Sequence, residues 1–119
     1  MPGLVLVIED DDGIREAVGY HLEEGGYPVV LAADGNSGLE MAEASRPDLI
    51  LLDLMVPGTN AAELLRQLRR VAGDTPILIM TAHELGPADR ASLGVDEGRL
   101  LRKPFSIQAL LDAVASACR

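Results

Sequence analysis

Five side chains able to do chemistry each follow an apolar run in this sequence. They are Glu9, Asp10, Asp53, Thr81 and Lys103. The runs before them are short and rich in Leu, Ile and Val, which is typical of buried strands of a parallel sheet. Because the carboxyl ends of parallel strands meet at one edge of a sheet, where ligands of open α/β folds bind, we expect these side chains to gather there.

The chemistry predicted for this group is phosphoryl transfer at a carboxylate. Three carboxylates within a few ångströms repel one another unless a cation neutralises them. Oxygen ligands without sulfur or imidazole favour Mg²⁺, with Mn²⁺ as an alternative, and Mg²⁺ keeps coordination positions open for phosphate oxygens. Lys103 would add one positive charge and Thr81 one hydrogen-bond donor for a phosphoryl group.

The elements that carry these residues are predicted to alternate between strand and helix. Strands are predicted at residues 4–8, 28–33, 49–52, 76–80 and 100–102. Helices are predicted to start at Asp11 or Asp12, after Asp34, at Asn60 and at Ser106. Between Glu84 and Gly94, Gly86 and Pro87 leave room only for a short, late-starting helix. The order is (βα)5, and right-handed crossovers then predict an α/β fold with a doubly wound parallel sheet covered on both faces.

Three of the helices have an apolar stripe that we expect to face the sheet. The first stripe is Ile14, Ala17, Val18, His21 and Leu22; the next is Ala61, Leu64, Leu65, Leu68 and Val71; the last is Ile107, Leu110, Leu111, Val114 and Cys118. In the helix after Asn60, we expect Arg66, Arg69 and Arg70 to lie on the opposite, solvent-facing side.

Composition limits the classes of function. A chain of 119 residues fits one compact domain, and a net charge of −9 argues against direct binding to nucleic acid or to an anionic membrane. The same charge suits a divalent cation or a basic partner. The one cysteine excludes an internal disulfide, and no leader-like or membrane-spanning run is present, so we expect a cytoplasmic protein.

Four motifs in this order resemble a known family. They are residues 4–10 with Ile14-Arg15, residues 53–58, Thr81-Ala82, and residues 103–105. Together they resemble the receiver domain of bacterial two-component response regulators, in the CheY-like superfamily, and the resemblance spans essentially residues 1–119 as one domain. It implies a five-stranded sheet of strand order 2-1-3-4-5.

The resemblance also implies residue roles. Asp53 would accept the phosphoryl group; Mg²⁺ would be held by Asp10, Asp53 and the backbone carbonyl of Met55, with Glu9 assisting through a water. Thr81 and Lys103 would contact the phosphoryl group, and the Lys103-Pro104 peptide would be cis. Such a domain is a phosphoryl acceptor that assists its own phosphorylation and dephosphorylation and is not a conventional enzyme.

The resemblance further implies partners and an output surface. The phosphoryl donor would be a sensor histidine kinase or phosphotransfer protein, and the signal would reach a downstream protein or a fused output domain. Partner binding would change through Thr81, the segment before the last strand, that strand and the last helix. Nucleic acid and membrane are not expected as direct partners of this domain.

Two other functions compete with a phosphorylated switch. A pseudo-receiver that binds partners without phosphate is suggested by Leu100, which stands where the family usually has an aromatic switch residue, and by the irregular segment 84–98. A Mg²⁺-dependent hydrolase with an aspartyl intermediate ranks last, because Asp53-Leu54-Met55 lacks a second acid two residues after Asp53.

Overall fold

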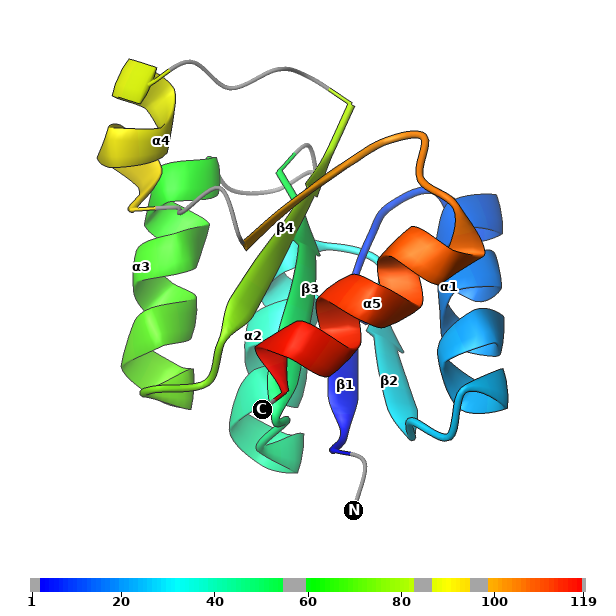
Figure 1. The fold of residues 1–119 in the computed structure, drawn as a ribbon. Coiled ribbons are helices and arrows are strands. Elements are labelled where there is room, and N and C mark those ends of the chain that lie inside the picture. The colour runs from blue at the N-terminus through cyan, green and yellow to red at the C-terminus, as the bar shows by residue number, and fades with distance from the viewer. Residues whose placement is uncertain (1–2, 55–59, 83–86, 95–98, 119) are drawn as a thin grey trace.

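The chain folds as alternating strands and helices around one parallel sheet (Figure 1). The computed structural model describes residues 3–54, 60–82, 87–94 and 99–118. The strands are β1 (Val5–Ile8), β2 (Val29–Ala32), β3 (Leu49–Asp53), β4 (Ile77–Thr81) and β5 (Leu100–Arg102). The helices are α1 (Asp12–Glu24), α2 (Gly35–Ser45), α3 (Ala61–Ala72), α4 (Pro87–Leu93) and α5 (Ile107–Ala117). The strand order β2-β1-β3-β4-β5 confirms the predicted α/β fold. In the described ranges, no helix combines the length and the apolar character that crossing a membrane requires.

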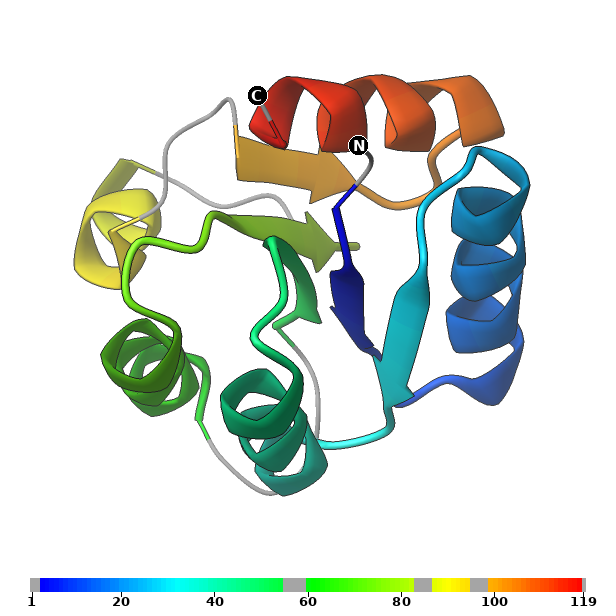
Figure 2. The same cartoon turned by 90° about the horizontal axis from the view of Figure 1, so that it is seen from below.

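The sheet is the middle of three layers (Figure 2), with α1 and α5 on one face and α2 and α3 on the other. Alternate residues of each strand point to opposite faces, so β1 sends Val5 and Val7 into the core under α1 and α5, and Leu6 and Ile8 into the core under α2 and α3. All four of these side chains are fully buried. This two-sided burial explains why the strands are continuous apolar runs in the sequence.

Polar side chains begin the helices at the predicted positions. Asp34 and Asn60 each accept a hydrogen bond from a backbone N–H three residues later at 2.8 Å, and Ser106 does so at 3.0 Å. Of the two acids proposed for the first helix, Asp11 is the cap, accepting from the Ile14 N–H at 2.9 Å. These caps satisfy backbone donors that have no partner inside the helix. As predicted, α4 is short and starts late, with Pro87 as its first residue.

Three predicted inward-facing residues are exposed instead. Val71 is 38% exposed because the buried stripe of α3 continues through Ala72, which lies seven residues after Leu65 and so almost directly below it on the helix. Ala17 is exposed and Ile107 is 49% exposed. Both line an open apolar groove of about 530 Å³ between α1 and α5.

Candidate functional site

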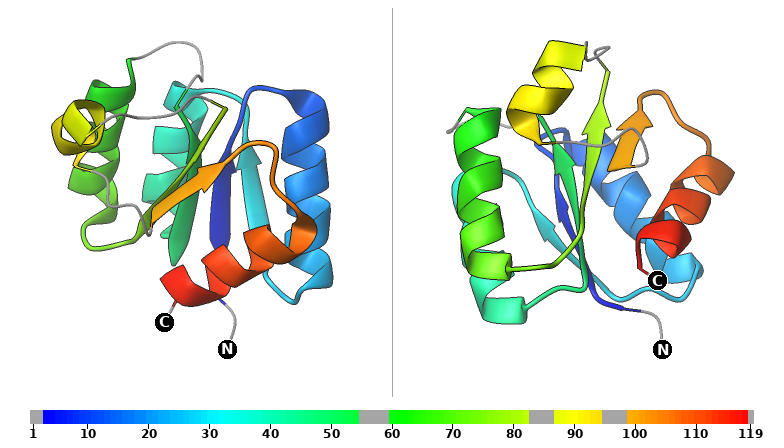
Figure 3. Two further views of the ribbon diagram at one scale, coloured as in Figure 1. Left: turned by 45° about the horizontal axis from the view of Figure 1, so that its top comes forward. Right: turned by 60° about the vertical axis from the view of Figure 1, so that its left-hand side comes forward.

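The sheet brings the predicted site residues to one edge. Glu9 and Asp10 directly follow β1, and Asp53 is the last residue of β3. On the neighbouring strands, Thr81 is the last residue of β4, and Lys103 directly follows β5. Parallel pairing of Asp53 with Met80, and of Thr81 with Arg102, makes these strands end at nearly the same level. The right-hand view of Figure 3 shows β4 and β5 running in the same direction, so that their carboxyl ends lie at the same end of the sheet.

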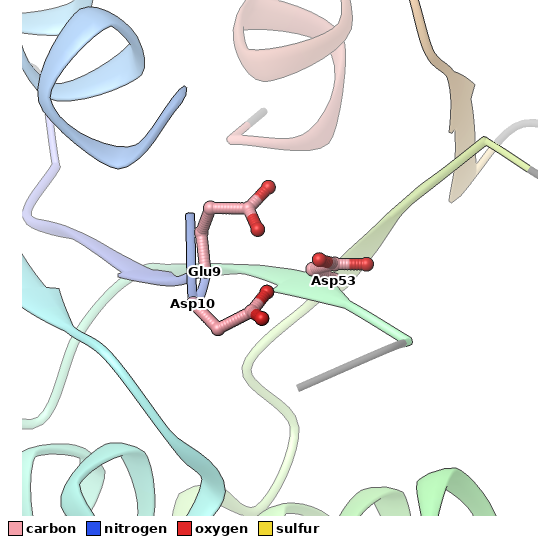
Figure 4. Close-up of side chains that lie close together, drawn as sticks. All are labelled: Glu9, Asp10 and Asp53. Carbon is pink, nitrogen blue, oxygen red and sulfur yellow. The ribbon is translucent and has the colours of Figure 1, made fainter. Parts of the chain in front are cut away.

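Three carboxylates form an acidic cluster at this edge. Figure 4 shows Glu9 and Asp10 side by side after β1, with Asp53 across from them on β3. One ligand oxygen from each of the three residues lies within 4.8 Å of the others. Glu9 is fully buried and Asp53 is 4% exposed, whereas Asp10 is exposed, so the cluster opens to solvent on the side of Asp10.

The donor set of this cluster fits a hard divalent cation. All three ligand groups are carboxylates, and the group includes neither the imidazole of a histidine nor the thiol of a cysteine. Such oxygen sets are typical of Mg²⁺, Mn²⁺ and Ca²⁺. Three carboxylates that include a fully buried one and a nearly buried one are costly to keep charged, and a bound cation would offset that cost. The backbone carbonyl of Met55, predicted as a ligand together with Asp10 and Asp53, lies outside the described residues.

Lys103 closes the other side of the cluster. Its Nζ lies 2.5 Å from Glu9 Oε1 and 3.4 Å from Asp53 Oδ2, and its side chain is only 15% exposed. Its backbone N–H donates to the carbonyl oxygen of Thr81 at 2.8 Å, which ties the lysine to the end of β4. The peptide bond to Pro104 is cis, as predicted from the resemblance.

Burial and pairing shift the pKa values of two site residues. Burial raises the pKa of Glu9 to about 7, and a hydrogen bond with Asp53 acts in the same direction, while the bond from Lys103 opposes both. Burial alone would lower the pKa of Lys103, but the carboxylates of Glu9 and Asp53 outweigh it and hold that pKa above its ordinary value. The site therefore places a charged ammonium beside a carboxyl group whose pKa is raised by burial.

Thr81 completes the set of predicted residues at the edge. It is 1% exposed and ends the strand next to β3, whose last residue is Asp53. The structure therefore brings together Glu9, Asp10, Asp53, Thr81 and Lys103, the five side chains that the sequence predicted to gather.

The direct Glu9–Lys103 ion pair was not foreseen from the sequence, which assigned Glu9 to a bridging water and Lys103 to a phosphoryl group. The sequence signal for it is that Glu9 directly follows an apolar run typical of a buried strand, and a buried acid is rarely left without a cationic or hydrogen-bonding partner. Lys103 is the only lysine of the chain and follows β5, which is separated from β1 in the sheet by β3 and β4.

Comparisons with known proteins agree with this geometry. The family model described as "Response regulator receiver domain" matches residues 5–115. Response regulator MprA of Mycolicibacterium vanbaalenii is 37% identical over 119 residues, which cover 100% of this chain and 52% of that protein. The chain thus spans about half the length of the curated relatives it matches.

Solved structures give the same picture. The chemotaxis response regulator CheY4 of Vibrio cholerae superposes with a TM-score of 0.87 at 30% identity, covering 98% of this chain and 99% of that one. The receiver domain of sensor histidine kinase PA1611 from Pseudomonas aeruginosa has a TM-score of 0.86 at 27% identity, covering 99% of this chain and 98% of that one. That structure holds a magnesium ion coordinated in its active-site cleft. The sheet order, the acidic edge and the family match together show that this chain belongs to the receiver domain family of two-component response regulators.

Proposed function

We propose that Asp53 is a phosphoryl acceptor and that its phosphorylation, assisted by Mg²⁺, switches the affinity of this domain for a partner. The observation that supports this most is the site itself: the carboxylates of Glu9, Asp10 and Asp53 lie within 4.8 Å of one another, and the Lys103 ammonium lies 3.4 Å from Asp53. A nucleophilic carboxylate, a cation-binding oxygen set and a fixed positive charge are the parts that phosphoryl transfer needs.

In the proposed reaction, a carboxylate oxygen of Asp53 forms a bond to the phosphorus of a phosphohistidine as the bond from phosphorus to the histidine nitrogen breaks. The product is an acyl phosphate on Asp53 and a free histidine on the donor. Asp53 is 4% exposed, so its carboxylate is little solvated and is held in place by the end of β3. Lys103 would neutralise charge on the transferred group, and the Thr81 hydroxyl would donate a hydrogen bond to it.

Asp10 and Asp53 would hold the cation, Glu9 would assist through a water, and the carbonyl of Met55 would complete the protein ligands. When bound, Mg²⁺ supplies charge neutralisation and alignment for the phosphoryl oxygens, and Mn²⁺ offers the same oxygen-ligand chemistry. The same residues would assist hydrolysis of the acyl phosphate, so the domain would promote both its own phosphorylation and its own dephosphorylation while remaining an acceptor.

The partners follow from this role. The donor would be a sensor histidine kinase or a phosphotransfer protein, and the receiver would act on a downstream protein or on a fused output domain in the cytoplasm. Relatives such as MprA are about twice as long as this chain, which leaves length for an output region in those proteins. The net charge of −9 supports protein partners over direct contact with nucleic acid or membrane.

We place the output surface at α4, β5 and α5, next to Thr81. The short α4 and the three-residue β5 offer few contacts to hold one packing, which suits a segment with two arrangements of similar free energy. Leu100, at the family's usual aromatic position, is half-buried and packs against the core under α2 and α3. Output from this chain would therefore proceed without an aromatic side chain at that position.

Intact-mass spectrometry after incubation with Mg²⁺ and acetyl phosphate tests the proposal. The expected result is a gain of one phosphoryl group that disappears in EDTA and in Asp53→Asn. Asp74→Asn is the matched control, because it makes the same charge change at an exposed aspartate of the α3–β4 turn. A gain that persists in Asp53→Asn would place the acceptor elsewhere. No gain together with no Mg²⁺ binding would favour a pseudo-receiver.

A further inference from the structure

Arg15 is a partly buried basic side chain near the end of a helix where positive charge is unfavourable. It lies in the first turns of α1, close to the positive end of the helix dipole. Its side chain is nevertheless only 16% exposed, although arginine is rarely buried without partners. Its contacts must therefore compensate for the placement.

Those contacts join a strand end to a helix start. Arg15 Nη1 donates to the backbone carbonyl oxygen of Glu9 at 2.9 Å, and Nη2 donates to Asp12 Oδ1 at 2.6 Å. The planar guanidinium holds both acceptors at once in a fixed relative position, which a lysine ammonium on a flexible stem would not do.

The bond to the Glu9 carbonyl fixes the peptide that leads into Asp10. The N–H of Glu9 donates to the carbonyl oxygen of Ala32 on β2 at 3.0 Å, so the peptide group before Glu9 is held by the sheet. The peptide group after Glu9 has left the sheet and is held by Arg15. The direction in which Asp10 leaves β1 therefore depends on Arg15.

The ion pair with Asp12 holds one of the acids that follow β1 outside the acidic cluster. Four consecutive acids follow β1, and two of them have structural partners: Asp11 caps α1, and Asp12 pairs with Arg15. The other two, Glu9 and Asp10, face Asp53 in the acidic cluster. The local charge of Arg15 is balanced by Asp12, so the guanidinium does not add net repulsion against a cation in the cluster.

We infer that Arg15 is a positioning residue for the metal site: it orients the Glu9–Asp10 peptide so that both carboxylates meet Asp53, and it holds Asp12 away from them. Arg15 acts through the Glu9 carbonyl oxygen and Asp12 Oδ1, to which it donates hydrogen bonds. The inference rests on the proposed function in one respect, namely that the acidic cluster binds Mg²⁺.

Titration of the whole chain with Mg²⁺ by calorimetry tests the inference, using Arg15→Gln and Arg66→Gln. Arg66 is the matched control because it also pairs with an acid three residues earlier, Glu63, but its side chain is 68% exposed and lies on α3. We expect the Kd for Mg²⁺ to rise about tenfold or more in Arg15→Gln, as for other residues that orient metal ligands. Arg66→Gln should change the Kd less than about twofold, because its charge is screened by solvent.

Two further variants separate the contacts of Arg15. Asp12→Asn keeps the bond to the Glu9 carbonyl and should raise the Kd less than Arg15→Gln does. Arg15→Lys keeps the positive charge but not the planar guanidinium that donates to two acceptors at once, and it should give an intermediate Kd. It also serves as the test variant if Arg15→Gln does not fold. Equal Kd values for Arg15→Gln and wild type, or equal rises in Arg15→Gln and Arg66→Gln, would overturn the inference.

A metal-free measurement keeps this test distinct from the proposed function. The amide of Asp10 belongs to the same peptide group as the Glu9 carbonyl, so its ¹⁵N and ¹H shifts in EDTA should move in Arg15→Gln and stay in place in Arg66→Gln. An unmoved Asp10 amide would show that Arg15 does not hold this peptide. If wild type binds Mg²⁺ but accepts no phosphoryl group, the proposed function fails, while the Kd and shift comparisons still decide the role of Arg15.

Discussion

Replacing Lys103 with methionine should destabilise the metal-free protein by an amount that grows with pH. The substitution removes the ammonium that lies 2.5 Å from the fully buried Glu9. Breaking a buried ion pair usually costs about 3–5 kcal/mol, because the remaining charge is left uncompensated. Glu9 can reduce that cost by binding a proton, since its pKa in the folded protein is already about 7 and the bond from Lys103 is one of the interactions that keep it from rising further.

The sign of the pH dependence follows from the protons bound in each state. Unfolded, Glu9 has the ordinary pKa of 4.5. Above about pH 7, Glu9 of the folded wild type is ionised, as it is in the unfolded chain, so it adds no further pH dependence. In Lys103→Met the pKa of Glu9 rises above that of the wild type, so between the two values the folded variant holds a proton that the unfolded chain lacks. Its free energy of unfolding then falls by about 1.4 kcal/mol for each pH unit.

The difference between wild type and Lys103→Met should therefore be larger by about 2 kcal/mol at about pH 8.5 than at about pH 6. Urea unfolding in EDTA, followed by circular dichroism at both pH values, measures it. Lys103→Arg keeps the positive charge and is the control, with no comparable growth of the difference. A difference for Lys103→Met that is equal at both pH values, or larger at the lower one, would refute the role assigned to Glu9.

Three other predictions address the core, α4 and the cation. In Gly38→Ala the new Cβ would lie 2.5 Å from Ile8 Cδ1. The variant should be less stable than wild type, because overpacking costs about 1–3 kcal/mol and the better helix propensity of alanine returns only about 1 kcal/mol. Ile8→Val removes that Cδ1, so urea unfolding should show that Gly38→Ala costs less stability in the Ile8→Val background than in wild type. If the costs of the two substitutions simply add, the contact with Ile8 is not the cause. Arg69→Gln loses the hydrogen bonds from Arg69 to the carbonyl oxygens of Leu93 and Gly94. Hydrogen exchange should therefore become faster in residues 87–94, and the free energy of unfolding should fall by about 1 kcal/mol. Unchanged exchange in these residues would contradict a role of Arg69 in holding α4. Mg²⁺ binding should weaken as the pH falls below about 7, because Glu9 then takes up a proton. Calorimetry should find that the Kd for Mg²⁺ depends less on pH in Glu9→Gln than in wild type. An equal pH dependence in both proteins would contradict the role of Glu9.

The strands and the helix starts could be predicted because each has a local cause in the sequence. Strands buried on both faces must be apolar throughout, and β3 and β4 are read directly from such runs. A cap needs one polar side chain three residues before the N–H that it accepts from, and Asn60 and Ser106 satisfy that rule within a few residues of sequence. The strand order came from the resemblance, since hydrophobic patterns alone do not specify which strands are neighbours.

Which residues are buried in the last turn of a helix was harder to predict. The stripe of α3 was extended from Leu68 to Val71 by adding three residues, whereas the structure continues it through Ala72, and Val71 is 38% exposed. At the last turn of a helix, one residue of difference rotates the side chain by about 100°. Which residue of the last turn is buried then depends on where the neighbouring core lies. For α3 this is the core under α2 and α3, whose position is a property of the fold rather than of the helix sequence.

The acidic run after β1 shows why residue type and spacing predict a site more readily than they predict its internal contacts. Four acids stand in a row, and their types are nearly the same, yet the structure divides them between a helix cap, an ion pair with Arg15, and the acidic cluster. What separates them is the point at which the chain leaves the sheet. Glu9 still bonds to β2 through its N–H, and α1 begins at Asp12, so the backbone turns between these two residues. The contact of Glu9 with Lys103 joins residues 94 positions apart and depends on that turn, on the end of β5 and on the absence of solvent around Glu9. A local pattern can show that an acid and a lysine end their strands at one edge, but the ion pair between them follows only from the packed arrangement of both strand ends.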